Sequence, residues 1–390
     1  MTIRTEDRLL TSDFVFATLA NFANSLGTQM LMATLPVYVL GLGGSQTDAG
    51  LTTGIMAGTA LLLRPLVGWL TDAWRRRPLV LAGTSCYSLA SVVYLLAGSI
   101  PMLLLGRVVQ GLGVSCYTTA ANAYLADIAP PKRRAEAIGV FAAAASLGLL
   151  LGPAIGFVVV GLLGFTSLFL FSAGLGFTAF LISLFARERR KPPAGDHQPW
   201  SLRTGIITLD ALPAAWTALC LGVGFGANMS FLSIFAGSRG IENPGFYFTV
   251  QATALLVART FCGRMADRYG RAFVMIPGTA AMALALALLP VARDFSRFMI
   301  SAALFGFGFG AAQPATMALL VDRVRSEQRG LAMSTYFTGF DLGISLGSVA
   351  LGVVSQNWGF EVMWPLSALC TLLGTVSLRG ARRRPAPFPR

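Results

Sequence analysis

The feature that most constrains this chain is a succession of apolar segments, each long enough to cross a lipid bilayer as a helix. A membrane-spanning helix needs about 20 mostly apolar residues. In lipid its backbone satisfies its own hydrogen bonds, and these segments lack the polar–apolar alternation of barrel strands. The sequence therefore predicts an all-α membrane protein with twelve transmembrane helices, at about residues 13–41, 50–72, 79–98, 101–126, 135–162, 165–186, 210–238, 245–268, 273–291, 296–321, 328–355 and 359–379.

The amount and the placement of charge agree with this interpretation. Charged residues make up 12% of the chain, whereas soluble proteins carry about 25%. In a soluble protein the net charge of +13 would suggest nucleic-acid binding. Here the basic residues gather in the tails and in every second loop, and the intervening loops contain only Arg239, Arg293 and Arg297. Because this asymmetry follows the positive-inside rule, it predicts cytoplasmic termini and no nucleic-acid partner.

The residue types needed for metal, redox or histidine chemistry are scarce. The five cysteines lie singly in apolar segments, without a CxxC pair, and are typical of small buried hydrophobes. The single histidine, His197, lies in a Pro-rich segment. We therefore expect no metal, no cofactor and no enzymatic activity.

The chain aligns with itself at an offset of 195 residues. General apolarity does not align charged residues, so the coincidence of several charged positions indicates an internal duplication. We predict two pseudo-symmetric six-helix bundles, residues 1–186 and 210–390, joined by a cytoplasmic linker at 187–209. Parallel halves of this kind are a transporter plan, with the substrate near the membrane midplane between them. The matching pairs include Arg64 and Arg259, Gly68 and Gly263, Asp72 and Asp267, Arg76 and Arg271, Asp127 and Asp322, Gly148 and Gly343, and Gly152 and Gly347.

Two stretches at equivalent places in the halves, GWLTDAWRRR and GRMADRYGR, resemble the cytoplasmic loop motif G-x-x-x-D-R-x-G-R-R of the major facilitator superfamily. The first copy departs from the motif, with Ala73 in place of the basic residue and Arg75 in place of the glycine. The resemblance implies a conformational latch, in which an acid at a helix end makes contacts in one state only. The alternative is that the arginines are positive-inside anchors and that Asp127 and Asp322 are solvated helix-terminal charges. The implied latch residues are Gly68, Asp72, Arg76, Asp127, Gly263, Asp267, Arg268, Arg271 and Asp322.

The segment Arg107-Val-Val-Gln110-Gly111 resembles the R-x-x-Q-G motif of proton-coupled members of the same superfamily. The resemblance implies that Arg107 and Gln110 take part in proton coupling. An arginine within an apolar helix costs a few kcal/mol unless it is paired or hydrated. The alternative is an arginine whose side chain snorkels to the outer interface.

The segment from Gly139 to Phe157 resembles the antiporter signature G-x8-G-x3-G-P-x2-G-G, except that Phe157 occupies the place of the last glycine. The resemblance implies a twelve-helix drug:proton antiporter-like branch and hence efflux. The alternative is a role in packing alone, because glycines four residues apart permit close helix contact. The implied antiporter-motif residues are Gly148, Gly152, Pro153 and Gly156.

Asp341 lies near the centre of the predicted segment 328–355. A carboxylate at the membrane midplane costs about 2.5–3.5 kcal/mol on insertion scales. We predict that Asp341 faces a central cavity and binds the coupled proton or a cationic substrate group. The alternative is an aspartate that is hydrogen-bonded to a neighbouring helix.

The first predicted helix has amides where several drug exporters of this resemblance carry an acid, which favours a polar or zwitterionic substrate over a multidrug cation. Further polar and aromatic residues in the predicted helices are candidates to line the substrate cavity. For each the alternative is an interhelical hydrogen bond. These candidates are Asn21, Asn24, Gln29, Tyr117, Asn228, Gln251, Gln313, Tyr336 and Phe340.

Together these features predict a monomeric secondary transporter of the bacterial inner membrane, embedded in lipid. We expect proton-coupled antiport of a small amphipathic or zwitterionic molecule by alternating access. The alternative is a symporter or uniporter that takes up a sugar, an organic acid or a similar nutrient. A membrane enzyme or a non-transporting sensor is disfavoured by the short loops and by the lack of a GxxxxGK[ST] nucleotide-binding motif.

Overall fold

The computed structural model describes residues 10–130, 133–186, 209–241, 243–324 and 329–376. The described residues of the first half form five α-helices and those of the second half form six, together with the 3-10 turns η3 (Leu209–Ala211) and η4 (Leu289–Val291). The helices are α1 (Ser12–Gly41), α2 (Gln46–Ala73), α3 (Arg76–Leu96), α4 (Ile100–Ile128), α5 (Arg134–Leu184), α6 (Leu212–Ser238), α7 (Gly245–Tyr269), α8 (Arg271–Leu288), α9 (Phe295–Val321), α10 (Arg329–Trp358) and α11 (Phe360–Leu373).

Helix α5 contains two of the twelve predicted segments. Its regular geometry is interrupted at Gly164, which has φ 78° and ψ 175°, a conformation that glycine adopts without steric cost. The two arms run back along the same part of α1, because Asn21 bonds the first arm at Phe141 and Ala20 packs against Ala179 of the second. The twelve predicted segments therefore all correspond to helical arms of the described chain.

A glycine with the same backbone conformation occurs at the equivalent position of the second half. Gly359, 195 residues after Gly164, has φ 78° and ψ 171° and separates α10 from α11. Both glycines join a long helix to the helix that follows it. The duplication therefore extends to the backbone geometry of a connection as well as to the aligned charges.

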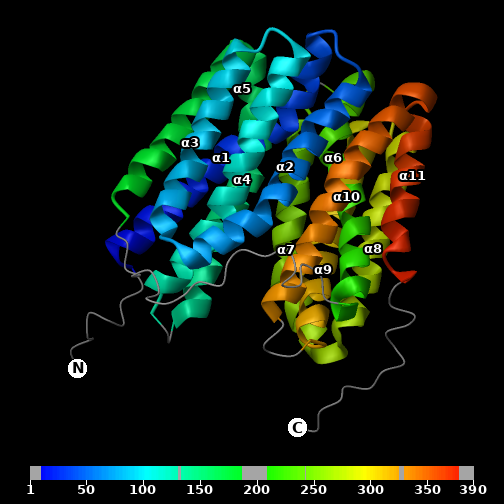
Figure 1. The fold of residues 1–390 in the computed structure, drawn as a ribbon. Coiled ribbons are helices and arrows are strands. Elements are labelled where there is room, and N and C mark those ends of the chain that lie inside the picture. The colour runs from blue at the N-terminus through cyan, green and yellow to red at the C-terminus, as the bar shows by residue number, and fades with distance from the viewer. Residues whose placement is uncertain (1–9, 131–132, 187–208, 242, 325–328, 377–390) are drawn as a thin grey trace. The chain divides into compact units, whose positions relative to one another are not determined.

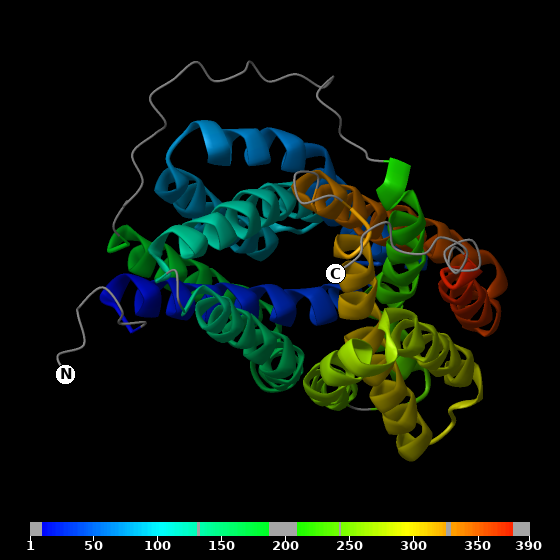
Figure 2. The ribbon, with the colours of Figure 1, turned by 90° about the horizontal axis from the view of Figure 1, so that it is seen from below.

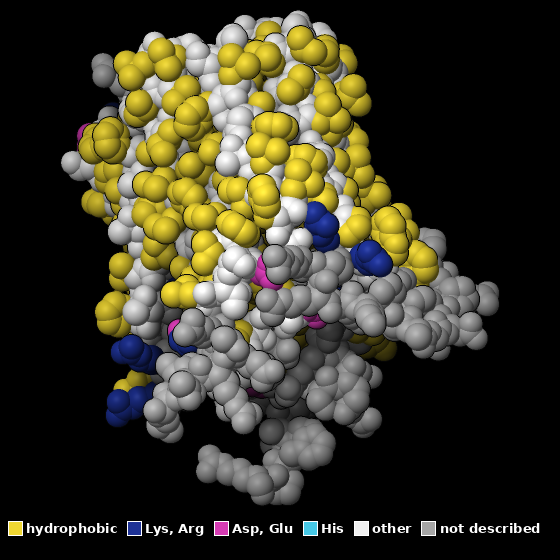
Figure 3. Space-filling view, turned by 90° about the vertical axis from the view of Figure 1, so that its left-hand side faces the viewer, with side chains coloured by type: hydrophobic (Ala, Val, Ile, Leu, Met, Phe, Trp, Pro, Cys, Tyr) yellow, Lys and Arg dark blue, Asp and Glu magenta, His cyan; other side chains and the backbone are white. Residues whose placement is uncertain are grey.

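Eight helices in the described part of the chain are long and apolar enough to cross a membrane, and the arms of α5 count as one of them. Figure 3 shows one face of the molecule, where hydrophobic side chains cover a broad band and the visible Lys and Arg side chains lie towards one end. An apolar band with charge displaced to its edge is the surface that a lipid bilayer requires. The surface thus agrees with the composition.

The chain forms two compact units, Met1–Tyr38 with Gly58–Ser201 (unit 1) and Val39–Ala57 with Leu202–Arg390 (unit 2). The sequence prediction assigned all of residues 1–186 to one bundle. The difference arises because the first part of α2 packs against α10. Ser345 Oγ donates to the carbonyl oxygen of Gly54 at 2.8 Å, and Thr47 bonds Gln356. The predicted linker at 187–209 lies outside the described residues except for Leu209.

Candidate functional site

Arg107 lies in the interior of unit 1 and is fully buried. Its Nη1 donates to Gln110 Oε1 at 2.9 Å and lies 3.7 Å from Met32 Sδ. The hydroxyl of Tyr94 on α3 donates to the same Gln110 oxygen at 2.7 Å. Burial of the whole arginine side chain excludes snorkelling to the outer interface. Arg107, Gln110 and Tyr94 thus form one buried polar network.

Local sequence explains how this network is assembled. Arg107 and Gln110 are three residues apart on α4, so they lie on the same helix face. Gly106 lets the Tyr94 ring approach that helix, because a Cβ at residue 106 would lie 2.5 Å from a ring carbon. The absence of a side chain at Gly106 therefore leaves room for Tyr94 to reach the Gln110 oxygen that also accepts from Arg107.

The antiporter-motif residues pack α5 closely against α1, and Figure 2 shows these two helices side by side. A Cβ at Gly148 would lie 2.5 Å from Ser25 Oγ, and one at Gly152 would lie 2.7 Å from the Cβ of Gln29. Gly156 faces the backbone of Met30 in the same way, at 3.2 Å. Pro153, which follows Gly152 in this part of α5, is also buried.

Unit 2 joins α10 to α6 through the equivalent glycines. A Cβ at Gly343 would overlap the carbonyl group of Leu219, and one at Gly347 would lie 3.0 Å from the Cα of Val223. Ser348 stands where unit 1 has Pro153, and its hydroxyl accepts a hydrogen bond from Ser230 at 3.2 Å. The glycine contact is therefore common to both units, whereas a hydrogen bond between the helices replaces the proline.

Asp341 lies near the middle of α10 and is half-buried. The neighbouring Phe340 packs its ring against Phe309 and Phe225, with centroid distances of 5.9 and 5.8 Å. Tyr336, one turn earlier, is fully buried in unit 2. The assignment of Asp341 to proton or substrate binding stays a prediction.

Three of the polar cavity candidates form hydrogen bonds between helices of one unit. Asn21 Nδ2 donates to the Phe141 carbonyl oxygen at 2.9 Å, which links α1 to α5. Asn228 Nδ2 donates to Gln251 Oε1 at 2.8 Å, which links α6 to α7. These contacts are the alternative that the sequence left open, and they give Asn21, Asn228 and Gln251 a role in helix packing.

The other candidates have different surroundings. Gln313 accepts a hydrogen bond from Arg259 at 3.5 Å. Tyr117 packs edge-on against Tyr87, with ring centroids 6.2 Å apart. Gln29 is half-buried beside Gly152, as described above, and Asn24 lines a small cavity within unit 1.

The predicted latch residues form the same ion pair in each unit. Arg76 Nε lies 2.7 Å from Asp127 Oδ2, and Arg271 Nε lies 3.2 Å from Asp322 Oδ2. Arg271 also pairs with Asp267, four residues before it. In both units the ion pair ties the start of one helix (α3 or α8) to the end of the next (α4 or α9).

The remaining latch residues are less closely packed. A Cβ at Gly68 or Gly263 would meet no atom within 4 Å in the described structure. The Arg268 guanidinium lies over the Tyr269 ring, 5.4 Å from its centroid. Asp72 lies in α2, but its side chain is outside the described part of the chain.

A model of the family described as Major Facilitator Superfamily matches residues 17–247 and 220–390. The chain belongs to this superfamily. It is therefore a multi-pass membrane protein and a secondary transporter of small molecules, not an enzyme. The two matches overlap at residues 220–247, from α6 into the start of α7, and together cover almost the whole described chain.

Relatives of the chain within the superfamily are distant but extend over most of its length. The uncharacterized MFS-type transporter MJ1560 of Methanocaldococcus jannaschii is 24% identical over 365 residues, covering 91% of this chain and 94% of the relative. The multidrug resistance protein MdtG of Klebsiella pneumoniae is 26% identical over 380 residues, covering 94% and 92%. A POT family transporter, solved with a thioalcohol-conjugated peptide, has a TM-score of 0.81 at 12% identity, covering 95% and 96%, and supports the fold alone.

The superfamily motifs did not reveal every polar contact of the helices. Tyr94 lies outside the motifs, and only its proximity to α4 in the fold shows that it completes the network of Arg107.

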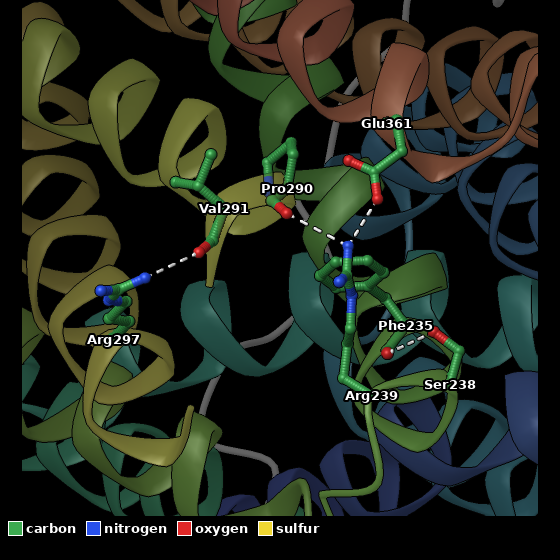
Figure 4. Close-up of polar contacts among 7 residues, drawn as sticks. All are labelled: Phe235, Ser238, Arg239, Pro290, Val291, Arg297 and Glu361. Atoms are coloured by element: carbon green, nitrogen blue, oxygen red, sulfur yellow. Dashed lines mark hydrogen bonds and ion pairs between the residues drawn. The ribbon is translucent and has the colours of Figure 1, made fainter. Parts of the chain in front are cut away.

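A second cluster, in unit 2, centres on Arg239 at the end of α6 (Figure 4). Its Nη2 donates to the Pro290 carbonyl oxygen at 3.1 Å and to Glu361 at the start of α11, and its guanidinium lies 5.1 Å from the Phe235 ring centroid. Arg239 is one of the three basic residues of the intervening loops, and this is the sequence signal for the cluster.

Proposed function

We propose that this transporter is a proton-coupled antiporter that exports a small amphipathic or zwitterionic molecule. The observation that carries the proposal is the buried network of Arg107, Gln110 and Tyr94. A permanent cation in a membrane protein's interior is expensive, so it is typical of a site that handles charge. Such a cation stabilises a carboxylate or an anionic substrate group and disfavours an additional cation nearby.

Asp341 is our candidate for the carboxyl group that carries the proton. It is half-buried near the middle of α10, where transfer from water disfavours the charged form. Binding a proton would neutralise the side chain, and releasing it would restore a charge that favours a different hydration state. A cycle of this kind can couple a pH gradient to the conformation of the transporter.

Two observations support efflux. The glycine face of α5 packs against α1 through Gly148, Gly152 and Gly156, and this face carries the antiporter signature. MdtG, which is 26% identical to this chain, is named as a multidrug resistance protein. The amides of α1 favour a polar or zwitterionic molecule as the exported compound.

Alternating access would use the two six-helix halves, 1–186 and 210–390, as moving parts joined by the linker at 187–209. The ion pairs of Arg76 with Asp127 and of Arg271 with Asp322 are candidates for contacts that stabilise one state of the cycle. We propose that the transporter functions as a monomer in the inner membrane, with both termini in the cytoplasm.

The proposal is tested by reconstituting the protein into liposomes that contain a pH-sensitive dye. Candidate compounds come from a metabolite and drug panel screened by shifts in melting temperature. With an acidic lumen, an antiporter accumulates the compound while the lumen becomes more alkaline. A symporter would instead accumulate it when the outside is acidic, and a uniporter would show no dependence on the gradient.

The role of Asp341 is tested in the same liposomes with Asp341→Asn. This variant should abolish accumulation driven by the pH gradient but retain exchange of labelled for unlabelled compound. Asp210→Asn, at an exposed aspartate before α6, is the matched control. Unchanged proton-driven transport and an unchanged pH dependence in Asp341→Asn would remove this carboxyl group from the mechanism.

A further inference from the structure

A small polar cavity lies inside unit 1, next to the network of Arg107. The centre of a water molecule can occupy about 10 Å³ of it, which is room for about one water. Residues of α1, α3, α4 and the second arm of α5 form its wall, so it lies within one unit. The lining residues are Asn24, Gly27, Thr28, Leu31, Tyr87, Ser91, Gln110, Ser172 and Gly176.

Three polar atoms at this cavity are buried without a hydrogen bond of normal geometry to the described protein: Asn24 Oδ1, Thr28 Oγ1 and Gln110 Nε2. A buried polar group without a partner costs about 1–3 kcal/mol. Such groups are rare in native proteins, and an ordered water is a common partner. Three of them around one cavity therefore indicate that the cavity is occupied.

The other polar side chains of the wall do not supply all of the missing bonds. Ser91 and Ser172 bond each other at 3.1 Å, and Ser91 also donates to the Tyr87 carbonyl oxygen at 3.1 Å. The Tyr87 hydroxyl is close enough to interact with both Asn24 and Thr28. The Tyr87 oxygen can accept from the Thr28 hydroxyl or the Asn24 amide, and its one proton can reach one further oxygen. Tyr87 can thus satisfy part of the hydrogen bonding of Asn24 and Thr28, but it does not supply an acceptor for Gln110 Nε2.

The internal duplication provides a comparison for this site. The positions in unit 2 that are equivalent to Asn24, Thr28 and Gln110 are apolar. Those equivalent to Tyr87 and Ser91 are apolar as well. The five unit 2 residues are Leu219, Val223, Met282, Leu286 and Phe305. At these five positions the polar wall is therefore a feature of unit 1, whereas Ser172 has a polar equivalent in Ser367.

We propose that this cavity binds ordered water, which accepts a hydrogen bond from Gln110 Nε2 and donates to Asn24 Oδ1 and Thr28 Oγ1. Three bonds are the usual number for a buried water. The water fixes the amide of Gln110 on one side, and the Gln110 oxygen holds Arg107 on the other. Asn24 and Thr28 are thus positioning residues for Arg107, a role that rests on the proposed proton coupling.

The water is tested by hydroxyl-radical labelling, in which X-rays generate radicals from water itself and mass spectrometry locates the modified side chains. Tyr87 is compared with Tyr247, a fully buried tyrosine of unit 2. In the wild-type protein Tyr87 should be modified faster than Tyr247. Equal rates for the two tyrosines in the wild-type protein would overturn the proposal.

The variants for this test take their residues from unit 2. Thr28→Val, alone and with Asn24→Leu, should reduce the labelling of Tyr87 to the rate of Tyr247. Thr34→Val is the matched control on the same helix, because the Thr34 hydroxyl bonds the Met30 carbonyl oxygen of its own helix at 2.7 Å. Labelling of Tyr87 that persists in the double variant, or that falls equally in Thr34→Val, contradicts the proposal.

The positioning role is tested separately, by the pH profile of transport in liposomes. Thr28→Val should shift the pH of half-maximal transport by about 0.5 unit or more, whereas Thr34→Val should leave it unchanged. The same profile for Thr28→Val and Thr34→Val would overturn the positioning role. A wild-type protein without any proton-driven transport would contradict the proposed function, while the labelling experiment would still decide whether the cavity holds water.

Discussion

The two units share the contacts that build the helix bundle and differ in the polar groups they bury. Gly148 and Gly343 occupy equivalent places in the α5–α1 and α10–α6 contacts. The buried Arg107 of unit 1, by contrast, corresponds to Ala302, and Gln110 corresponds to Phe305. The duplication has thus retained close helix packing, while the chemistry of the interior has become different in each half.

Unit 2 has a polar interior of its own at other positions. Its amide pair of Asn228 and Gln251 corresponds to Ala33 and Met56 in the first half of the chain. The pair is neutral, whereas the network of unit 1 contains a permanent charge. Under the proposed function, unit 1 would carry the fixed charge and unit 2 the candidate titrating group, Asp341.

The largest effect is expected when Arg107 of unit 1 is replaced by alanine, the residue at the equivalent position of unit 2. Arg107→Ala should reduce proton-driven transport at least about tenfold, which is about 1.4 kcal/mol. It removes the fixed charge and leaves Gln110 Oε1 with one donor, Tyr94. Initial rates in liposomes, at equal protein content, measure the effect.

Arg107→Lys distinguishes charge from geometry. Lysine keeps the charge but lacks the planar set of donors of a guanidinium, so it should restore only part of the activity. Transport by Arg107→Ala at the wild-type rate would show that the network is structural, and the proposed site would then be wrong.

The next largest effect concerns the glycines of the two equivalent helix contacts. An added methyl group should lower the free energy of unfolding by different amounts at the two places. Gly343→Ala should lower the free energy of unfolding by about 1–3 kcal/mol, the usual cost of overpacking, because its Cβ would overlap backbone atoms of Leu219. Gly148→Ala should cost somewhat less, because its closest contact is Ser25 Oγ at 2.5 Å, an atom that can rotate away, although Ser25 Cβ at 2.7 Å and Leu26 N at 2.8 Å cannot.

Gly139→Ala is the control for both substitutions, since a Cβ there meets no atom of the described structure within 4 Å. Thermal unfolding in one detergent measures the series. An equal loss for Gly148→Ala and Gly343→Ala would mean that Ser25 is as rigid as the backbone, and the two contacts would then be equivalent.

The sequence predicted the helices and the duplication well because both depend on local composition and spacing. The segments 13–41 and 296–321, for example, differ from α1 and α9 by one residue at one end. The sequence could not identify Tyr94 as a partner of Arg107, since that contact depends on how α3 packs against α4. It also could not show that Val39–Ala57 belongs to unit 2, because the contact with α10 joins residues about 300 positions apart.

For the candidate site, the residue types were predictable and their orientations were not. An arginine in an apolar helix requires partners, so the importance of Arg107 could be inferred from its position alone. An amide in such a helix can face a cavity or a neighbouring helix. Asn21 and Asn228 bond neighbouring helices, whereas Asn24 faces a small cavity. The difference is set by helix rotation, which a single sequence does not encode locally.

A smaller difference is expected between the amounts of stability that are lost when each of the two equivalent ion pairs is removed. The side chain of Arg76 is 9% exposed and that of Arg271 is 27% exposed. Removing one partner of a more buried pair costs more, because the other charge is left in a poorly hydrated place. Arg76→Gln should therefore cost about 1–3 kcal/mol of stability, and Arg271→Gln about 0–1 kcal/mol.

Thermal unfolding at low and high salt measures both variants, and only the effect of Arg271→Gln should shrink markedly as salt screens the exposed charges. If the two variants lose the same stability at both salt concentrations, the difference in burial does not control the strength of these pairs.

The smallest effect is expected for a contact that unit 2 has and unit 1 lacks. Arg239 and Glu361 correspond to Gly44 and Thr166, so unit 1 has no counterpart of this ion pair. Glu361→Gln should cost at most about 1 kcal/mol, since the carboxylate is largely exposed. Arg239→Ala should cost more than Glu361→Gln, because it also removes the hydrogen bond to Pro290 and the packing against the Phe235 ring (Figure 4). Equal melting temperatures for the two variants would show that the ion pair alone accounts for the contribution of Arg239.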